Sequence, residues 1–470
     1  MKTFVVNFAD YAKDKMLRGD EKFHLGMVET GWNLFGTPII NNIRLSEILQ
    51  EDYCLCSYDE YDEYKGIPTG QTYLDEDGEI IEYQSVTSEN HPGRLKYSVN
   101  YENILISSLR LAKSPALNFD IPNLDEYVFS NGFYIFKVSD KWDKRFVLYV
   151  LRSKQIKNFI DNNIYRGIGI SSYRVDDLLN VEIKNITINE QYKALDRIKP
   201  FEEKIKALKA QIQSVQEAID DIFALEFDFD YATFEELKKH KRFQIEFNSF
   251  ANNTDLRFSA KFHRNAGEFV MKQLQGITNK KIKNYLAEPI VLGASVSPTD
   301  YSDNGDYLYI SMATIKNWRF DEEDAKLVSR VYSDAKQNKT VCENDILMAR
   351  SGEGTIGKVA LIENSDINGV FADFTMRIRL VNYDHNFAYY YLRTTYFQYL
   401  IEIYKKGLGN NTNIFPIVLQ EFPLPDISLE EQKRIVDKIC TEIDKQNKIK
   451  AQIMDLRKQI DSIIENTLTV

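Results

Sequence analysis

Apolar residues recur with heptad spacing in two stretches of the chain. In the first stretch the spacings alternate between four and three residues, at Phe201, Ile205, Leu208, Ile212, Val215, Ile219 and Ile222. The second stretch has the same register at Ile449, Ile453, Leu456, Ile460 and Ile463. This pattern predicts two long helices, each with an apolar stripe that a partner helix must bury. Glu442 and Gln446 interrupt the pattern before Ile449, so we expect that part to be wetter or packed elsewhere.

The simplest partner for each predicted helix is the other one, in an antiparallel coiled coil with a globular part at each end. About 35 residues at about 1.5 Å each make a rod of about 50 Å. Pairing of the same stripes between two copies of the chain is the alternative, because a heptad stripe does not say which helix covers it.

The sequence also repeats itself, with an offset of 241 residues. Phe146, Leu151 and Arg152 recur as Phe387, Leu392 and Arg393. Further along, Ile186, Glu190, Gln191, Asp196 and Ile198 recur as Ile427, Glu431, Gln432, Asp437 and Ile439. Ordered matches over so much of the chain indicate a duplicated unit, which we interpret as a globular part followed by a long helix.

The globular parts have the patterns of mixed secondary structure. Short alternating runs such as 306–313, 344–350 and 375–381 are typical of strands. An amphipathic helix is predicted over 146–160, and its copy begins at Phe387. In that copy the tyrosines are expected on the core side, at Tyr389, Tyr390, Tyr391, Tyr396 and Tyr399. We therefore expect an α+β protein with two duplicated α/β domains separated by the two long helices.

Composition and charge narrow the class of protein. The 470 residues are 43% hydrophobic and 13% aromatic, which is enough for more than one core. The net charge of −11 argues against a protein that coats nucleic acid through bulk charge, although a local DNA-reading face is compatible with it. Much of the excess acid lies between Glu51 and Glu82. Four scattered cysteines, no apolar run of about 18 residues and no signal-peptide pattern predict a reducing, cytoplasmic setting.

Three local strings carry a resemblance to a known family. They are LRFSAKFH at 256–263, NDILMARSGEGTIGKVALI at 344–362 and FPLPDISLEEQKRIVDKI at 422–439. Together with the duplicated units and the long helices, they resemble the specificity (S) subunits of type I restriction–modification systems. The resemblance covers essentially the whole chain and is strongest from Lys241 onward. The first unit departs from it, with EIKNITINEQ where the second unit has PLPDISLEEQ.

The resemblance implies a DNA-binding protein without catalytic activity of its own. Target-recognition domains would occupy 1–188 and 241–427, and helical spacers would occupy 189–240 and 428–470. Each domain would read one half of a bipartite double-stranded DNA target, with the gap set by the helices. Two methyltransferase (M) subunits and the restriction (R) subunits would be its partners. S-adenosylmethionine, ATP and magnesium would act in those partners, and no cofactor, metal or catalytic residue is expected in this chain.

Two glycine-containing segments of the second unit are candidates for DNA contacts. The segment 352–358 is predicted to be a hairpin tip whose backbone N–H groups and cations approach the DNA backbone. The segment 405–413 could pair asparagine with adenine edges and lysine with phosphates, or be a plain turn. The predicted contact residues are Arg350, Ser351, Thr355, Lys358, Lys405, Lys406, Asn410 and Asn411, with Arg110, Arg166, Ser172 and Arg174 in the first unit.

Two other classes of function stay open. The segment 352–358 nearly matches a phosphate-binding loop, which would suit a nucleotide-using enzyme. However, Val359 lacks the hydroxyl that such a loop places on magnesium, and the residues that follow are predicted to form a strand. The acidic run from Glu51 to Glu82 leaves room for a duplicated protein-binding scaffold, or for an anti-restriction or defence adaptor. The chain contains no N-P-P-[YF] string of an adenine methyltransferase.

Overall fold

The computed structural model describes most of the chain. The described residues are 32–36, 41–58, 63–70, 72–75, 77–109, 116–118, 121–165, 172–240, 242–248, 257, 259–352, 354–407 and 412–469. The chain forms two compact units, Met1–Gln211 with Lys450–Val470, and Ile212–Ile449. The long helix α16 (Leu429–Thr469) therefore contributes its first part to the second unit and its last part to the first. The division into two globular and two helical segments stays a prediction.

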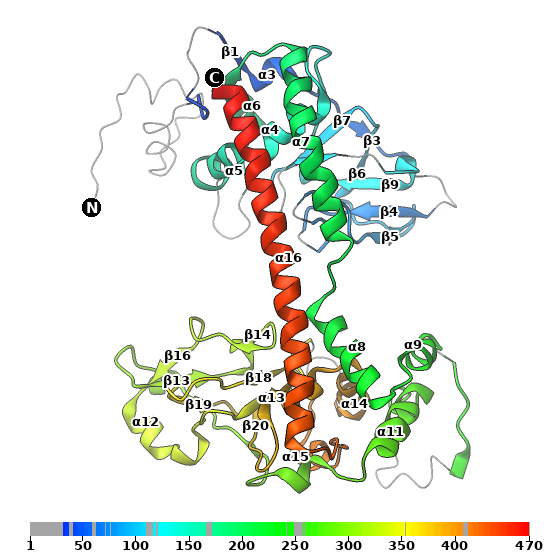
Figure 1. Ribbon diagram of the computed structural model, residues 1–470, viewed down its shortest axis with the longest axis vertical. Coiled ribbons are helices and arrows are strands. Elements are labelled where there is room, and N and C mark those ends of the chain that lie inside the picture. Colours follow the sequence, from blue (N-terminus) through cyan, green and yellow to red (C-terminus); the bar gives the residue numbers. More distant parts are fainter. Residues whose placement is uncertain are drawn as a thin grey trace. The chain divides into compact units, whose positions relative to one another are not determined.

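The described part of the first unit combines sheets and helices (Figure 1). One antiparallel sheet has the order β2 (Leu49–Glu51), β10 (Phe133–Val138), β7 (Asn103–Ser107), β8 (Ala116–Asn118). A second has the order β3 (Cys54–Leu55), β6 (Leu95–Ser98), β9 (Tyr127–Ser130), β4 (Tyr64–Ile67), β5 (Gln84–Val86). A third pairs β1 (Asn42–Arg44) with β11 (Glu182–Lys184). The helical segments are α3 (Leu45–Ile48), η2 (Leu124–Glu126), α4 (Lys144–Arg152), α5 (Lys154–Phe159), η3 (Ile160–Ile164), α6 (Val175–Leu179), α7 (Ile188–Lys209) and the last part of α16.

The second unit is built in the same manner. One antiparallel sheet has the order β12 (Val291–Leu292), β20 (Thr375–Ile378), β17 (Ile346–Ala349), β18 (Val359–Leu361). A second has the order β16 (Lys326–Val328), β13 (Tyr307–Ile310), β19 (Gly369–Phe371), and β14 (Ile315–Lys316) pairs with β15 (Arg319–Phe320). The α-helices are α8 (Val215–Phe227), α9 (Tyr231–Lys239), α11 (Asn265–Ile277), α12 (Arg330–Ala335), α13 (His385–Arg393), α14 (Thr395–Tyr404), α15 (Pro416–Leu419) and the first part of α16. Short 3-10 turns are η4 (Ile282–Tyr285), η5 (Pro298–Asp300), η6 (Met312–Thr314) and η7 (Gln337–Lys339).

The two units share a strand order. In the first, β4 runs parallel to β9 and antiparallel to β5. In the second, β13 runs parallel to β19 and antiparallel to β16. The antiparallel sheets β2-β10-β7-β8 and β12-β20-β17-β18 correspond strand for strand. Helices α4 and α13 begin 241 residues apart, and so do α7 and α16. The mixed α and β content predicted from the sequence is confirmed, and the offset found in the sequence relates equivalent elements of the structure.

The recurring Glu-Gln pair has the same structural role in both units. The side chain of Gln191 is fully buried and accepts the backbone N–H of Asp143, at 2.7 Å, where α4 begins. Gln432 accepts the N–H of Asp384 at the start of α13, also at 2.7 Å. The preceding glutamates complete capping boxes with Thr187 and Ser428. These bonds attach the start of each long helix to the globular part before it, because a buried backbone N–H must find an acceptor.

Substitution of Gln432 by alanine is expected to lower the free energy of unfolding by about 1–3 kcal/mol, because the N–H of Asp384 then has no acceptor. Urea unfolding of the full chain measures this change. The exposed neighbour Lys433 supplies the control, since Lys433→Ala is expected to stay within about 0.5 kcal/mol of the parent. Equal effects of the two substitutions would show that this hydrogen bond does not stabilise the fold.

The first long helix is not continuous, contrary to prediction. Helix α7 ends at Lys209 and α8 begins at Val215, because Ser214 and Glu217 form a capping box that starts a new helix. Ile212 lies in the break with 39% of its surface exposed. Of the other predicted stripe residues here, Ile205 and Ile219 are buried, whereas Phe201, Leu208, Val215 and Ile222 are half-buried. In α16 all five are buried: Ile449, Ile453, Leu456, Ile460 and Ile463.

The interruption of the second heptad stripe has a structural reason. Gln446 is only 1% exposed, so this part of α16 is not wetter than the rest. Its Oε1 accepts the backbone N–H of Gln213 at 3.0 Å, within the break between α7 and α8. At the other end of α8, Glu226 pairs with Arg434 of α16. Since Gln213 meets Gln446 and Glu226 meets Arg434, α8 and the first part of α16 run antiparallel.

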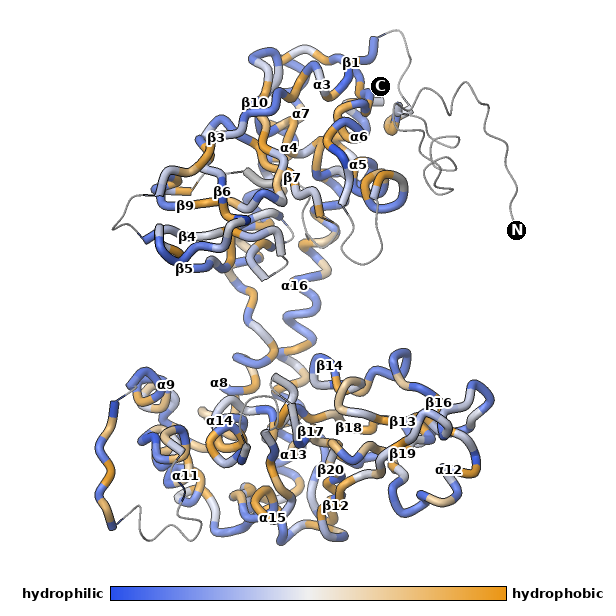
Figure 2. Tube along the Cα trace, turned by 180° about the vertical axis from the view of Figure 1, so that it is seen from behind, coloured by the Kyte–Doolittle hydropathy of each residue, from blue (hydrophilic) through white to orange (hydrophobic). Residues whose placement is uncertain are grey.

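The core of the second unit joins α8 to the sheet and to α13 and α14. Phe223 of α8 is fully buried, with its ring centroid 5.3 Å from that of Phe387 and 5.9 Å from that of Tyr391. The predicted tyrosine positions lie on this side: Tyr389, Tyr391 and Tyr396 are buried, and Tyr390 and Tyr399 are partly buried. Apolar residues also follow the strands β17, β18 and β20 (Figure 2).

Candidate nucleic-acid interface

The segment 352–358 forms a hairpin turn between β17 and β18. The two strands pair antiparallel, with Met348 opposite Val359. Gly352, Gly354 and Gly357 have φ of +90°, +77° and +84°, the left-handed region that glycine adopts without strain. A strand follows the turn, whereas a phosphate-binding loop leads into a helix. The segment therefore has the predicted hairpin geometry and lacks the local fold of a nucleotide site.

The two candidate segments of the second unit lie against each other. The hydroxyl of Ser351 donates to the carbonyl oxygen of Thr412 at 3.1 Å, and the N–H of Ile414 donates to the carbonyl oxygen of Arg350 at 2.9 Å. Helix α14 holds the hairpin from the other side, because Gln398 Nε2 donates to the carbonyl oxygen of Gly357 at 2.9 Å. Residues far apart in the sequence thus form one surface. Asn410 and Asn411 lie outside the described residues.

The predicted contact residues of this surface differ in their exposure and in whether their side chains already bind other residues of the chain. Arg350 donates from Nε to the carbonyl oxygen of Asp373 at 3.1 Å, and the Thr355 hydroxyl donates to the carbonyl oxygen of Ser351 at 2.8 Å. Lys405 is 9% exposed and pairs with Glu402 at 2.6 Å. Ser351 is likewise buried, whereas Lys406 is exposed and Lys358 is half-buried. Within the described residues Lys358 forms no ion pair, so its ammonium is the candidate with most freedom to meet a phosphate.

The first unit repeats this arrangement with fewer described residues. Leu109, directly before Arg110, forms an isolated antiparallel bridge with Ser172. Ser172 is exposed, and Arg174 pairs with Asp177 at 3.5 Å. Arg110 and Arg166 lie outside the described residues. DNA contacts by these four residues stay predictions.

A cavity of about 540 Å³ opens beside the hairpin. It is lined by Gln216, Trp318, Gly354, Ile356, Lys358, Arg393, Thr395, Gln398, Glu402 and Lys405. Trp318 and Arg393 are absent from the predicted contact residues. Arg393 had one signal in the sequence, its recurrence 241 residues after Arg152, whereas Trp318 had none, because the first unit has no tryptophan at the corresponding place.

Comparison with known families finds a match in the second unit. Residues 289–456 match the family model of the type I restriction modification DNA specificity domain. This part of the chain is therefore similar to the DNA specificity domain of type I restriction modification systems. This confirms the resemblance seen in the sequence. The matched residues include the hairpin, the segment after Lys405 and most of the cavity.

Solved structures with low identity are similar to the chain. One belongs to a study of complex assembly and conformational transition of the type I R-M system, with 16% identity, coverage of 91% of this chain and 97% of that chain, and a TM-score of 0.47. The HsdS subunit from Thermoanaerobacter tengcongensis shows 15% identity, coverage of 91% and 96%, and a TM-score of 0.34. The type I S subunit from M. genitalium shows 14% identity, coverage of 91% and 96%, and a TM-score of 0.39. No curated protein matches the chain. The assignment rests on the family match, because all three TM-scores are below 0.5.

Helix α8 positions α14 within the second unit, which holds most of the residues matched by the family model. Asp220 Oδ1 accepts the N–H of Thr395, the first residue of α14, at 2.7 Å, and its Oδ2 accepts the Thr395 hydroxyl at 2.5 Å. Burial raises the pKa of Asp220, although these hydrogen bonds favour the charged carboxylate. Since Gln398 of the same helix holds the hairpin, α8 is linked through α14 to the candidate contact surface.

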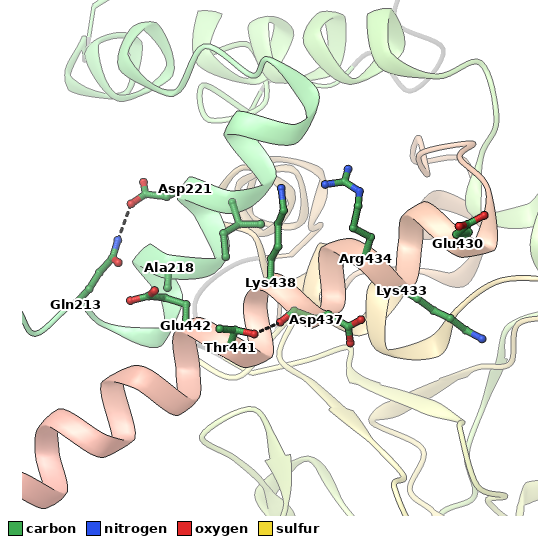
Figure 3. Close-up of a pocket in the computed structure, with 11 residues that line it drawn as sticks. Gln213, Ala218, Asp221, Glu430, Lys433, Arg434, Asp437, Lys438, Thr441 and Glu442 are labelled. Carbon is green, nitrogen blue, oxygen red and sulfur yellow. Dashed lines mark hydrogen bonds between the residues drawn. The ribbon is translucent and has the colours of Figure 1, made fainter.

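A groove of about 810 Å³ lies between α8 and the first part of α16 (Figure 3). Its α16 side is highly charged, with Glu430, Lys433, Arg434, Asp437, Lys438 and Glu442. Gln213, Ala218, Asp221 and Ile222 line the α8 side. Arg434 and Lys438 both bind Glu226, each at 2.5 Å. This ion-pair cluster connects α8 to the first part of α16.

The stability of the second unit is expected to depend on pH through Glu226. Hydrogen bonds from Arg434, with a further one from Lys438, lower the pKa of Glu226 from 4.5 to about 2. Because this pKa is depressed in the folded state, the charged carboxylate of Glu226 stabilises the fold above pH 4.5. This stabilisation is lost as the pH falls toward 2 and the carboxylate becomes protonated. Arg434 and Lys438 are both half-exposed, so solvent screens their interaction with Glu226. We therefore expect these ion pairs to contribute about 1–2 kcal/mol to the free energy of unfolding.

Urea unfolding between pH 2 and pH 6 measures this contribution. Glu226→Gln is expected to flatten the pH dependence over that window. Glu236→Gln, at an exposed position of α9, is the control and is expected to leave the profile unchanged. A parent-like profile in Glu226→Gln would contradict the assignment of the shift to this ion pair.

Among the residues that the structure describes, no helix is both long and apolar enough to cross a membrane.

Proposed function

We propose that the chain is the DNA-specificity subunit of a type I restriction–modification complex. The observation that carries the proposal is the match of residues 289–456 to the DNA specificity domain, over the same residues that bring the hairpin and the segment after Lys405 together. Glycine backbone N–H groups, Lys358 and Lys406 suit contacts to phosphates. The chain supplies recognition and takes no part in catalysis.

The target is proposed to be bipartite double-stranded DNA, with one half read by each unit. The shared strand order of the two units supports two readers. Divergent loops support different half-sites, because the first unit has LISSLRLAKSPALN where the second has the glycine hairpin. The two readers are target-recognition domains, and α7, α8 and α16 form the antiparallel spacer that sets the gap.

Two methyltransferase subunits and the restriction subunits are the proposed partners. The charged groove between α8 and α16 supports docking on the helices, since its α16 side presents both signs of charge. S-adenosylmethionine, ATP and magnesium act in those partner subunits under this proposal.

The protein-scaffold alternative loses much of its support. It relied on the acidic run from Glu51 to Glu82. In the first unit, however, Asp75, Asp77 and Glu79 of that run form ion pairs with Lys209, and Asp77 also binds Arg457. These carboxylates are therefore engaged within the chain and are less available to an external partner.

The test is to co-express the chain with the methyltransferase subunit from its own operon and to map methylated adenines in the host DNA. A split motif with two half-sites and a fixed gap is expected. Absence of methylation, with both proteins soluble and associated, would sink the proposal. A single half-site or a palindrome would show that only one unit reads, or that two chains pair.

Charge reversal separates DNA reading from the alternatives. Lys358→Glu is expected to weaken DNA binding, because a carboxylate then faces the backbone phosphates. Lys272→Glu on the exposed face of α11 is the matched control. Equal DNA affinity of the two variants would remove the hairpin from the interface.

A further inference from the structure

A buried arginine that has no counter-ion among the described residues lies in the cavity beside the hairpin. Arg393 is 7% exposed, and its guanidinium lies over the rings of Trp318, Tyr389 and Tyr390, at 5.3, 5.1 and 5.7 Å from their centroids. Its Nη1 donates to the hydroxyl of Tyr389 at 2.9 Å. Within the described residues its buried Nε has no acceptor, and no carboxylate pairs with it.

The described residues that line the cavity carry excess positive charge. Lys358 and Lys405 line it together with Arg393, and among the described lining residues Glu402 is the only carboxylate. Glu402 is already engaged, at 2.6 Å from Lys405 and 2.7 Å from Lys261. A buried cation without a countercharge is unfavourable, and stacking on aromatic rings compensates for its lost hydration only in part. An anion that reaches Lys358 and Arg393 would therefore be stabilised.

The first unit has the same arginine in a different environment. Arg152 ends α4 as Arg393 ends α13, 241 residues later. It lines a cavity of about 1140 Å³ together with Asp77 and Glu79. Burial lowers the pKa of Arg152, and the charges of Asp77, Asp75 and Glu79 oppose this. In the first unit, carboxylates of the chain itself therefore supply the countercharge.

Hydrogen bonds connect the three acidic residues to one another and to α16. Asp75 Oδ1 accepts the N–H groups of Asp77 and Glu79, both at 2.8 Å. Asp77 accepts two hydrogen bonds from Arg457 of α16, at 2.9 and 2.8 Å. These three residues form an acidic turn in the connection from β4 to β5. The equivalent connection of the second unit, from β13 to β16, carries Trp318 instead and brings no carboxylate into the lining of the cavity beside Arg393.

We propose that the cavity around Arg393 is an anion site that holds one phosphate group of the DNA backbone, and that the acidic turn of the first unit fills the equivalent site with carboxylates. The phosphate oxygens accept from Arg393 and Lys358. Arginine suits this ligand because its planar fork matches phosphate geometry, with lysine adding a mobile charge. The DNA source of the phosphate rests on the proposed function, whereas the anion site itself does not.

The salt dependence of DNA binding tests the site. Each phosphate neutralised by the protein adds about 0.9 to the slope of log K against log salt. The full chain is titrated with a duplex carrying the mapped methylation motif, at several KCl concentrations. Arg393→Gln is expected to lower the slope by about 1 and to weaken binding on all sequences alike. Arg393→Lys keeps the charge and is expected to retain the parent slope.

The first unit supplies the matched control. Arg152→Gln is expected to leave the slope unchanged, since its charge is already balanced by the chain. Asp77→Asn combined with Glu79→Gln should uncover the equivalent site and steepen the slope. If Arg393→Gln and Arg152→Gln change the slope equally, or not at all, the proposal is wrong. A circular dichroism spectrum like that of the parent shows that each variant is folded.

A second measurement does not require DNA binding. Inorganic phosphate is titrated against the full chain with Trp32 and Trp142 replaced by phenylalanine, so that Trp318 reports alone. A fluorescence change that Arg393→Gln abolishes supports an anion site. If that change occurs while the DNA slope is insensitive to Arg393, free phosphate is the ligand and the DNA assignment fails. If the parent binds no DNA, the proposed function fails and the phosphate titration still decides the anion site. No response in either measurement overturns the inference.

Discussion

Replacement of Phe223 by alanine is expected to lower the free energy of unfolding of the second unit by about 3–5 kcal/mol. The ring is fully buried and packs against Phe387, Tyr391 and Phe227, with centroids 5.3, 5.9 and 6.0 Å away. Its removal leaves a cavity where α8 meets α13. Because α8 also caps α14 through Asp220, the loss should extend to the hairpin and reduce DNA affinity as well.

Urea unfolding followed by the fluorescence of Trp318, which lies in the second unit, measures this change in chains with Trp32 and Trp142 replaced by phenylalanine. Leu225 on the same helix is 81% exposed, so Leu225→Ala keeps the helix and removes no core contact. It is expected to change stability by no more than about 0.5 kcal/mol. If Phe223→Ala were as stable as Leu225→Ala, α8 would not be anchored in this core.

The second large effect is expected at the hairpin, from Gly357→Ala. A Cβ at Gly357 would lie 2.6 Å from Gln398 Oε1 and 2.9 Å from Ile401 Cγ2, and φ is +84°. An alanine in the left-handed backbone conformation alone costs about 1–2 kcal/mol, and the close contact with α14 adds to this cost. We therefore expect the free energy of unfolding to fall by about 3 kcal/mol in total. Relief of the contact would move Lys358, the next residue, and DNA affinity should fall with it.

Gly354 provides the matched control. Its φ of +77° gives a similar backbone cost, but a Cβ there meets nothing within 4 Å. Gly354→Ala is therefore expected to lower the free energy of unfolding by about 1–2 kcal/mol and to keep most of the DNA affinity. Equal losses in the two variants, measured by urea unfolding and DNA titration, would show that the contact with α14 does not position the hairpin.

Local patterns of the sequence predicted several elements correctly. The glycines of 352–358 have the positive φ values that suit the predicted hairpin. The 241-residue offset linked α4 to α13 and Arg152 to Arg393. These signals could be found because each depends on residues a few positions apart, or on direct similarity between two stretches.

The heptad spacing of apolar residues did not predict the break between α7 and α8, because this spacing describes only one face of a helix. Heptad spacing runs unbroken through Ile212, yet the Ser214 capping box and the acceptor on Gln446 favour ending one helix and beginning another. In the sequence Gln446 only interrupts the apolar heptad positions. Its hydrogen-bond partner, Gln213, lies far away in the sequence, so the reason for a polar residue at this position could not be predicted. Packing, and the need to satisfy buried backbone groups, decided the outcome.

By itself, the sequence determined the α+β class, the repeat, the hairpin and the resemblance to a specificity subunit. Only the tertiary structure decided which candidate residues meet, and what surrounds them. Arg152 and Arg393 are equivalent in the repeat, but carboxylates of the chain lie near one and aromatic rings enclose the other. The charge and burial around a side chain depend on segments that folding brings together from distant positions, so no local pattern could distinguish these two arginines.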